Sequence, residues 1–99
     1  MIVDVHTHCL QPEHLSAAVH RSVERAGYPP MQPLSPATYL EHMEVVDRAI
    51  VFGIRGVATG MRSPNDFTAE WVAHQPDKLI GFMAIDPTEE DHLEEVDRC

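Results

Sequence analysis

The sequence predicts an α/β fold with a parallel sheet, because segments with strand character alternate with segments that have helical spacing. Three short segments are β-branched or continuously apolar, namely residues 2–7, 49–54 and 79–85. Helical patterns separate these segments, and another follows the last one. Such alternation favours parallel strands joined by right-handed crossovers.

The first strand and the first helix are predicted from their apolar positions. Ile2, Val3, Val5 and Thr7 are β-branched, which favours a strand. A helix is expected next, because apolar or small residues recur at the spacing of one helix face: Leu15, Ala18, Val19, Ser22, Val23 and Ala26. Gly27 suits the C-terminal cap of this helix. Residues 28–36 contain four prolines and predict an extended loop.

The later elements are marked by caps and by two apolar runs. Ser35-Pro36 predicts an N-cap and first turn for a helix that continues to about residue 45. The apolar run 49–54 is typical of a strand covered on both faces. Ser63-Pro64 predicts a second helix start, with Asp66 in the capping-box position. In that helix we expect Phe67 and Trp71 to pack in the core. A strand over 79–85 and a helix opened by residues 88–91 complete the pattern.

Composition and charge narrow the class of protein. The chain has 99 residues, 43% of them hydrophobic, so it forms one globular domain at most. A net charge of −9 argues against nucleic acid and anionic membranes as partners. The two cysteines lie at opposite ends of the chain, which favours a reducing compartment. No signal peptide or membrane-spanning run is visible, so we expect a cytoplasmic protein.

Three parallel strands alone leave open edges and a half-covered core. An eight-stranded (β/α)₈ barrel typically needs about 250 residues. We therefore expect residues 1–99 to be the N-terminal portion, about three βα units, of a TIM-type barrel domain. The alternative is a small three-layer α/β domain that is complete in itself.

The strongest candidate for a functional site is Asp4-Val5-His6-Thr7-His8. The two-residue period of a strand places Asp4, His6 and His8 on one face and Val3, Val5 and Thr7 on the other, where they suit packing against helices. Two imidazoles on one face of a strand can both direct a ring nitrogen at a divalent ion such as Zn²⁺. Barrel chemistry gathers at the carboxyl ends of the strands, where this pair lies. We expect Asp4 to orient one of the histidines.

Other polar residues are weaker candidates. Arg55 follows the second strand and could bind a substrate carboxylate. Asp86 is expected to cap or turn the chain before Pro87, and Cys9 to point away from the histidine pair. Solvated positions on or near helices are expected for nearly all of the other histidines: His14, His20, His42, His74 and His92.

Two stretches resemble the amidohydrolase superfamily. The opening Met1-Ile2-Val3-Asp4-Val5-His6-Thr7-His8 is similar to the start of that superfamily. Residues 74–87, His-Gln-Pro-Asp-Lys-Leu-Ile-Gly-Phe-Met-Ala-Ile-Asp-Pro, resemble the third-strand region of its amidohydrolase family 2 branch, which includes the aminocarboxymuconate-semialdehyde decarboxylase-like enzymes. Residues 63–71 resemble the segment before that strand.

The resemblance implies a metal-dependent hydrolase or decarboxylase that acts on a small carboxylated or lactone substrate. It implies Zn²⁺ or another divalent ion bound by His6 and His8, with the remaining ligands and the catalytic groups beyond residue 99. The 99-residue chain alone is then expected to be inactive, and homo-oligomers are possible. Two alternatives stay open: a TatD-like or phosphoesterase barrel, which also begins with His-x-His, and a non-enzymatic chain that associates with another chain.

Overall fold

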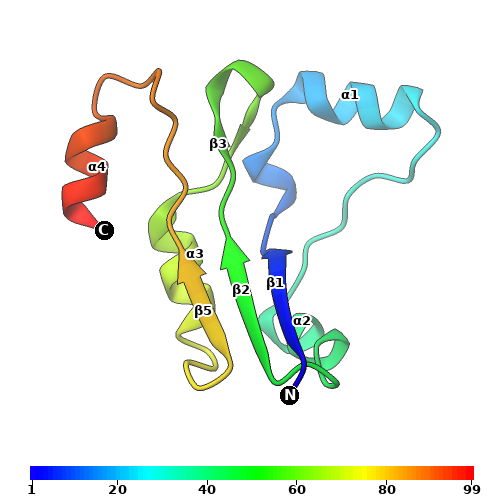
Figure 1. Cartoon of the computed structure of the whole chain (residues 1–99). Helices are drawn as coiled ribbons and strands as arrows, with labels where there is room; N and C mark the ends of the chain where they lie inside the picture. Colours follow the sequence, from blue (N-terminus) through cyan, green and yellow to red (C-terminus); the bar gives the residue numbers. More distant parts are fainter.

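A computed structural model describes all residues, Met1–Cys99, and its centre is a parallel three-stranded sheet (Figure 1). The strands are β1 (Val3–His8), β2 (Arg48–Phe52) and β5 (Leu79–Phe82), in the order β1-β2-β5. Both pairings are parallel, so each new strand is added beside the previous strand in chain order. The predicted α/β class and parallel pairing are confirmed.

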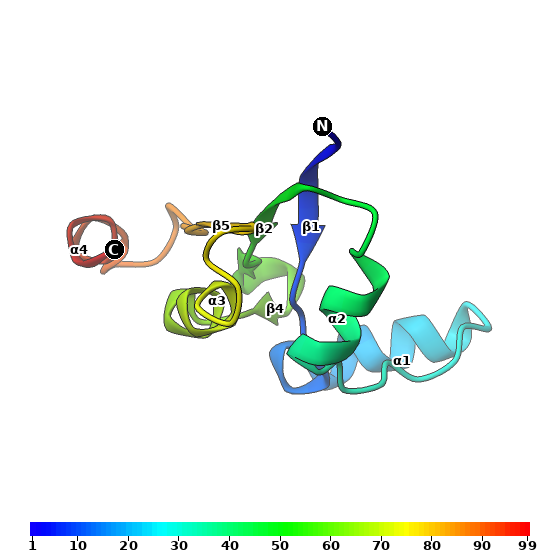
Figure 2. The same ribbon diagram turned by 90° about the horizontal axis from the view of Figure 1, so that it is seen from below.

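The helices leave one face of the sheet uncovered. The α-helices are α1 (Ala17–Arg25), α2 (Pro36–His42), α3 (Asn65–Val72) and α4 (His92–Arg98), and 3₁₀ turns span Pro12–His14 and Val57–Thr59. Figure 2 shows α2 and α3 on one side of the sheet and α4 beyond the β5 edge. Ala49 and Val51 are fully buried on the helix side. The prediction that β2 is covered on both faces is wrong, because the residues that alternate with them stay partly exposed.

The core lies between the sheet and these two helices. Its buried apolar residues are Cys9, Tyr39, Ala49, Val51, Trp71 and Leu79. The rings of Tyr39 and Trp71 meet edge to face, with centroids 5.6 Å apart. Phe67 packs against this cluster, so the predicted core positions of Phe67 and Trp71 are confirmed.

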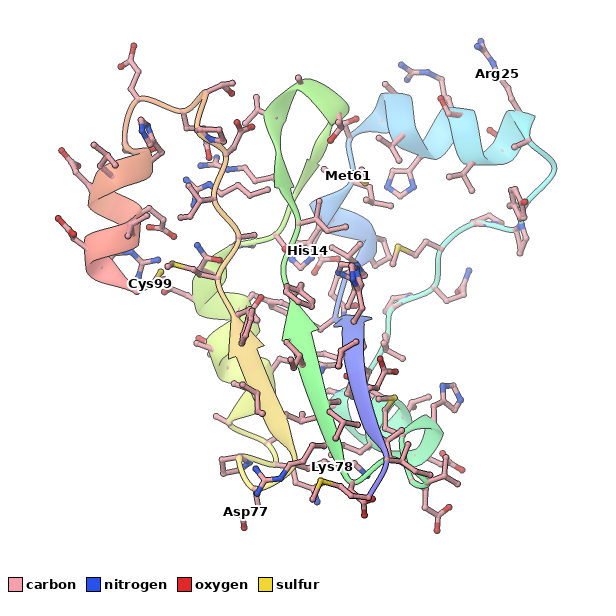
Figure 3. The ribbon with its side chains drawn as sticks, in the orientation of Figure 1. His14, Arg25, Met61, Asp77, Lys78 and Cys99 are labelled. Atoms are coloured by element: carbon pink, nitrogen blue, oxygen red, sulfur yellow. The ribbon has the colours of Figure 1, made fainter.

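A small hairpin between β2 and α3 was not predicted from the sequence. Its strands β3 (Arg55–Gly56) and β4 (Met61–Arg62) pair antiparallel above the carboxyl end of β2. The hairpin contacts the other two strand-to-helix connections, since Gly60 accepts from the backbone of Ser16 at 2.8 Å and Val57 donates to Asp86 at 2.9 Å. In Figure 3, Met61 and His14 mark this carboxyl end, and Lys78 marks the amino end.

The predicted helix boundaries hold in part. The Ser35 hydroxyl caps α2 by accepting from the Thr38 amide, and Gly27 follows α1 with a φ of 79°, both as predicted. The capping box at residues 63–66 is wrong: α3 has no side-chain cap, because the buried Ser63 hydroxyl bonds to the backbone of Ile54 instead. The last helix begins at His92 rather than at residue 88.

Candidate metal centre

His6 and His8 lie side by side at the carboxyl end of β1, on the face of the sheet that no helix covers. Their Nε2 atoms are 3.1 Å apart, and their ring centroids are 4.9 Å apart. The Phe52 ring packs beside both, at centroid distances of 5.0 Å from His6 and 6.2 Å from His8. The structure therefore brings the predicted histidine pair together, with the two Nε2 atoms within hydrogen-bond distance of each other.

A β-bulge in β1 decides which way these rings face. Asp4 is paired with Ala49, but the register shifts before Thr7 pairs with Val51 and His8 pairs with Phe52. Paired residues of neighbouring strands point to the same face. Asp4 therefore lies on the helix side with Ala49, whereas His8 lies on the bare side with Phe52.

The predicted role of Asp4 is thus wrong. Its carboxylate does not reach either imidazole ring; it accepts a hydrogen bond from the backbone N–H of His6 at 3.0 Å. That donor lies within the bulge, where the regular ladder of the sheet is interrupted. Asp4 supports the bulge rather than a ligand ring. Thr7 lies on the helix side as predicted, where its hydroxyl is hydrogen-bonded to that of Tyr39. The same prediction is wrong for Val3 and Val5, which are 44% and 64% exposed.

The backbone fixes the protonation pattern of His8. Its Nδ1 lies 3.2 Å from the carbonyl oxygen of Phe52. A carbonyl only accepts, so Nδ1 carries the hydrogen and the neutral ring has its lone pair on Nε2. His6 Nε2–H can then donate to that lone pair across the 3.1 Å gap. An imidazole held through Nδ1 with Nε2 free is the usual state of a metal-binding histidine.

The spacing of the two Nε2 atoms fits a shared ion. With zinc–nitrogen bonds of about 2.0–2.1 Å, two nitrogens of a tetrahedral site lie about 3.3 Å apart. The observed 3.1 Å is close to this value, and an ion between the two nitrogens would require His6 to carry its hydrogen on Nδ1 instead of Nε2. Within the chain, however, no group of three or more histidine, cysteine, aspartate or glutamate side chains could hold a metal. Any further ligands have to come from outside these residues.

Arg55 is engaged by carboxylates of the chain itself. Its guanidinium is 7% exposed and pairs with Glu89, with Glu95 at 3.1 Å and with Asp91 at 3.8 Å. The Glu89 hydrogen bond, ahead of the opposing effect of burial, raises the pKa of Arg55 above its ordinary value. The structure thus places the Arg55 side chain, at the start of the hairpin, against carboxylates at and before α4, while a role in binding a substrate carboxylate stays a prediction.

Asp86 and Glu95 anchor the connection between β5 and α4. Asp86 accepts from the hydroxyl and backbone N–H of Thr88 and from Val57, which lowers its pKa to about 2. The predicted turn role of Asp86 is confirmed. Hydrogen bonds from Arg98 and then Asn65 lower the pKa of Glu95 to about 2. The sequence analysis did not identify Glu95.

The remaining candidates lie away from the histidine pair. Cys9 is buried in the core, and this burial raises the pKa of its thiol, so it points away from the pair as predicted. His42 and His74 are exposed as expected. The expectation fails for His14, which is 8% exposed, accepts from the Gln11 backbone and has its pKa lowered by desolvation.

A groove of about 680 Å³ lies between α3, β5 and α4, and neither His6 nor His8 lines it. No helix has the length and apolar character needed to cross a membrane. Comparisons with protein-family profiles, with curated proteins and with solved structures found no match to this chain.

Proposed function

We propose that this chain contributes the first metal ligands of a metal-dependent hydrolase or decarboxylase of the amidohydrolase family 2 type. His6 and His8 hold Zn²⁺ or another divalent ion, and the further ligands lie outside residues 1–99. The observation that carries this proposal is the pair of Nε2 atoms 3.1 Å apart at the carboxyl end of a parallel strand.

The sheet is compatible with the first three strands of a TIM-type barrel. In such a barrel, parallel strands follow one another in chain order, helices cover the outside, and the inner face carries side chains only. The order β1-β2-β5, with α2 and α3 on one face, agrees with this arrangement. The inner face then corresponds to the bare face that carries the histidines.

The residues around the pair suit a small substrate with an apolar part. The Phe52 and Phe82 rings, 5.3 Å apart and edge to face, extend an apolar surface from the imidazoles across two strands. The Phe52 carbonyl keeps His8 Nδ1 protonated, so that Nε2 stays available. A bound divalent ion would polarise a carbonyl or carboxylate oxygen of the substrate as a Lewis acid. A small lactone or an unsaturated carboxylic acid offers both features.

Zinc affinity tests the ligand assignment directly. Isothermal titration of the chain with Zn²⁺ is compared with that of His6→Ala and His8→Ala. His74→Ala is the matched control, because His74 is also exposed but lies after α3. Losing one of two ligands is expected to weaken zinc binding at least tenfold in the first two variants and to leave the control unchanged. Equal affinities for all four proteins would remove the pair from the site.

A further inference from the structure

Thr7 lies between the two histidines in the sequence and points to the opposite face of β1. Its hydroxyl oxygen lies 2.5 Å from the phenolic oxygen of Tyr39, which belongs to α2. Figure 2 shows α2 next to β1. Successive residues of a strand point to opposite faces, so His6 and His8 face the bare side when Thr7 faces α2. The direction of the Thr7 side chain is therefore coupled to that of both imidazoles.

The backbone ladder gives this part of β1 limited support. β1 is an edge strand in the order β1-β2-β5, so it is paired with β2 alone. The register of that pair shifts between Asp4 and Thr7, where the bulge interrupts the regular ladder. A slip of one residue at this point would turn the side chains that follow to the other face. A side-chain bond from the strand to a helix therefore adds to the few contacts that distinguish the two arrangements.

Tyr39 is well anchored on the helix side of the sheet. It is 5% exposed, and its ring meets that of Trp71 edge to face. The segment after β1 is also attached to the segment before α2, because the Gln11 side chain donates to the Leu34 carbonyl at 2.6 Å and accepts from the Leu34 N–H at 3.1 Å. The helix therefore offers Thr7 a partner at a fixed position.

The Tyr39 hydroxyl also disfavours the alternative arrangement. Burial raises the pKa of Tyr39 above its ordinary value, ahead of the opposing effect of the Thr7 hydrogen bond, so the phenol stays protonated near neutral pH. A buried hydroxyl needs a hydrogen-bond partner, and the structure gives it Thr7. If Thr7 turned away, the hydroxyl would be left unpaired in an apolar core, which costs more than the loss of the bond itself.

We propose that Tyr39 is a positioning residue for the metal centre: through Thr7, its hydroxyl keeps His6 and His8 on the bare face. This assignment rests on the proposed function and adds to it a residue that touches neither the ion nor the substrate. An ion can reach the pair on the bare face, whereas the opposite face is packed against the helices. The apparent zinc affinity is then proportional to the fraction of chains in the observed arrangement.

Tyr39→Phe tests the assignment, because it keeps the ring and removes only the hydroxyl. In isothermal titration of the whole chain, the zinc dissociation constant is expected to rise roughly two- to tenfold, as the loss of one hydrogen bond shifts the equilibrium between the arrangements. In the zinc-free chain, nuclear magnetic resonance is expected to show a weaker Overhauser effect between the His6 and His8 rings, whose centroids are 4.9 Å apart. The ring nitrogen shifts of His8 are expected to lose the pattern of an imidazole with its hydrogen on Nδ1.

Two sets of controls separate positioning from a general loss of stability. Leu79→Val shortens a buried side chain of β5, which is not paired with β1. It is expected to lower the free energy of unfolding and to leave the ring signals and zinc affinity of the folded chain unchanged. Thr7→Val removes the other hydroxyl of the bond, so Tyr39→Phe is expected to cause no further loss of zinc affinity in that background. Thr7→Ser keeps the hydroxyl and is expected to keep most of the native affinity.

The outcomes distinguish this assignment from the proposed function. If the native chain binds zinc through His6 and His8, and Tyr39→Phe changes neither the affinity nor the ring signals, the positioning role is overturned and the ligand assignment stands. Equal losses of affinity in Tyr39→Phe and Leu79→Val also overturn it. If no variant binds zinc, the ligand assignment fails and the ring signals decide: a change in Tyr39→Phe but not in Leu79→Val supports the positioning role, and unchanged signals overturn it.

Discussion

The side chain of Asn65 joins three elements, and its removal is expected to be among the more costly single changes in this chain. The residue is 5% exposed at the first position of α3. Its amide donates to the Ala84 carbonyl at 3.1 Å and to Glu95 at 2.7 Å, and its oxygen accepts from the Ala84 N–H at 2.8 Å. It thereby attaches both the chain after β5 and α4 to α3.

The magnitude follows from these three hydrogen bonds. A typical bond contributes a net of about 1 kcal/mol; where a buried partner is left unpaired the cost is ~1–3 kcal/mol instead, and it stays at the lower end for the half-buried Ala84. Asn65→Ala removes all three bonds and leaves both backbone groups of Ala84 unpaired, whereas Glu95 keeps its bonds to Arg55 and Arg98. We expect a loss of about 2–4 kcal/mol in the free energy of unfolding.

Urea unfolding, followed by Trp71 fluorescence and by far-ultraviolet circular dichroism, measures this loss. In thermal unfolding, a loss of about 3 kcal/mol corresponds to a fall of on the order of 10–20 °C in Tm for a domain of this size. Asp66→Ala is the control, because Asp66 is the next residue and makes an exposed ion pair with Arg98, which is worth at most about 1 kcal/mol. Equal losses for the two variants would refute the reasoning.

Two further predictions concern the connections at the carboxyl end of the sheet. Gly60→Ala is expected to destabilise the fold by at least about 1 kcal/mol more than Gly27→Ala. Both glycines have a positive φ. An added Cβ at Gly60 would clash with the Ser16 hydroxyl, whereas an added Cβ at Gly27 would have no atom within 4 Å. Equal urea midpoints would contradict this difference. The pKa of Asp86 is lowered from 3.8 to about 2. Its ionised carboxylate therefore stabilises the folded chain at pH values above 3.8, and this contribution is lost as the pH falls toward 2. Urea titrations between pH 2 and 5 should therefore show a smaller loss of stability on acidification for Asp86→Asn than for the native chain, and superimposable pH profiles would contradict that assignment.

The sequence predicted the features that depend on near neighbours. The spacing of His6 and His8 was enough to bring their rings together, because residues two apart on a strand share a face, and the register shift between Asp4 and Thr7 leaves both rings on the same side. The caps at Ser35 and Gly27 were also predictable, since each depends on residues within one turn of a helix.

The features that escaped prediction depend on distant partners or on very short elements. Strands β3 and β4 have two residues each, too few to show a period. Arg55 finds Glu89 and Glu95 at sequence separations of 34 and 40 residues, so the pattern around Arg55 contains no sign of them. Ser63 looked like a helix cap because its hydroxyl can satisfy a backbone amide, and it does so at Ile54 instead of in α3.

The bulge in β1 shows why a correct local pattern can still give the wrong face. Without the register shift, strict alternation from the Asp4–Ala49 pair would set His6 opposite the buried Val51, so Asp4, His6 and His8 would all face the helices. The extra residue moves Thr7 to the helix side, where it meets Tyr39, and turns both imidazoles to the bare face. Asp4 holds this arrangement by accepting the His6 backbone N–H inside the bulge. Asp4 therefore contributes to the candidate metal centre by fixing the register of the strand, and the predicted contact with a ligand ring is not needed for that role.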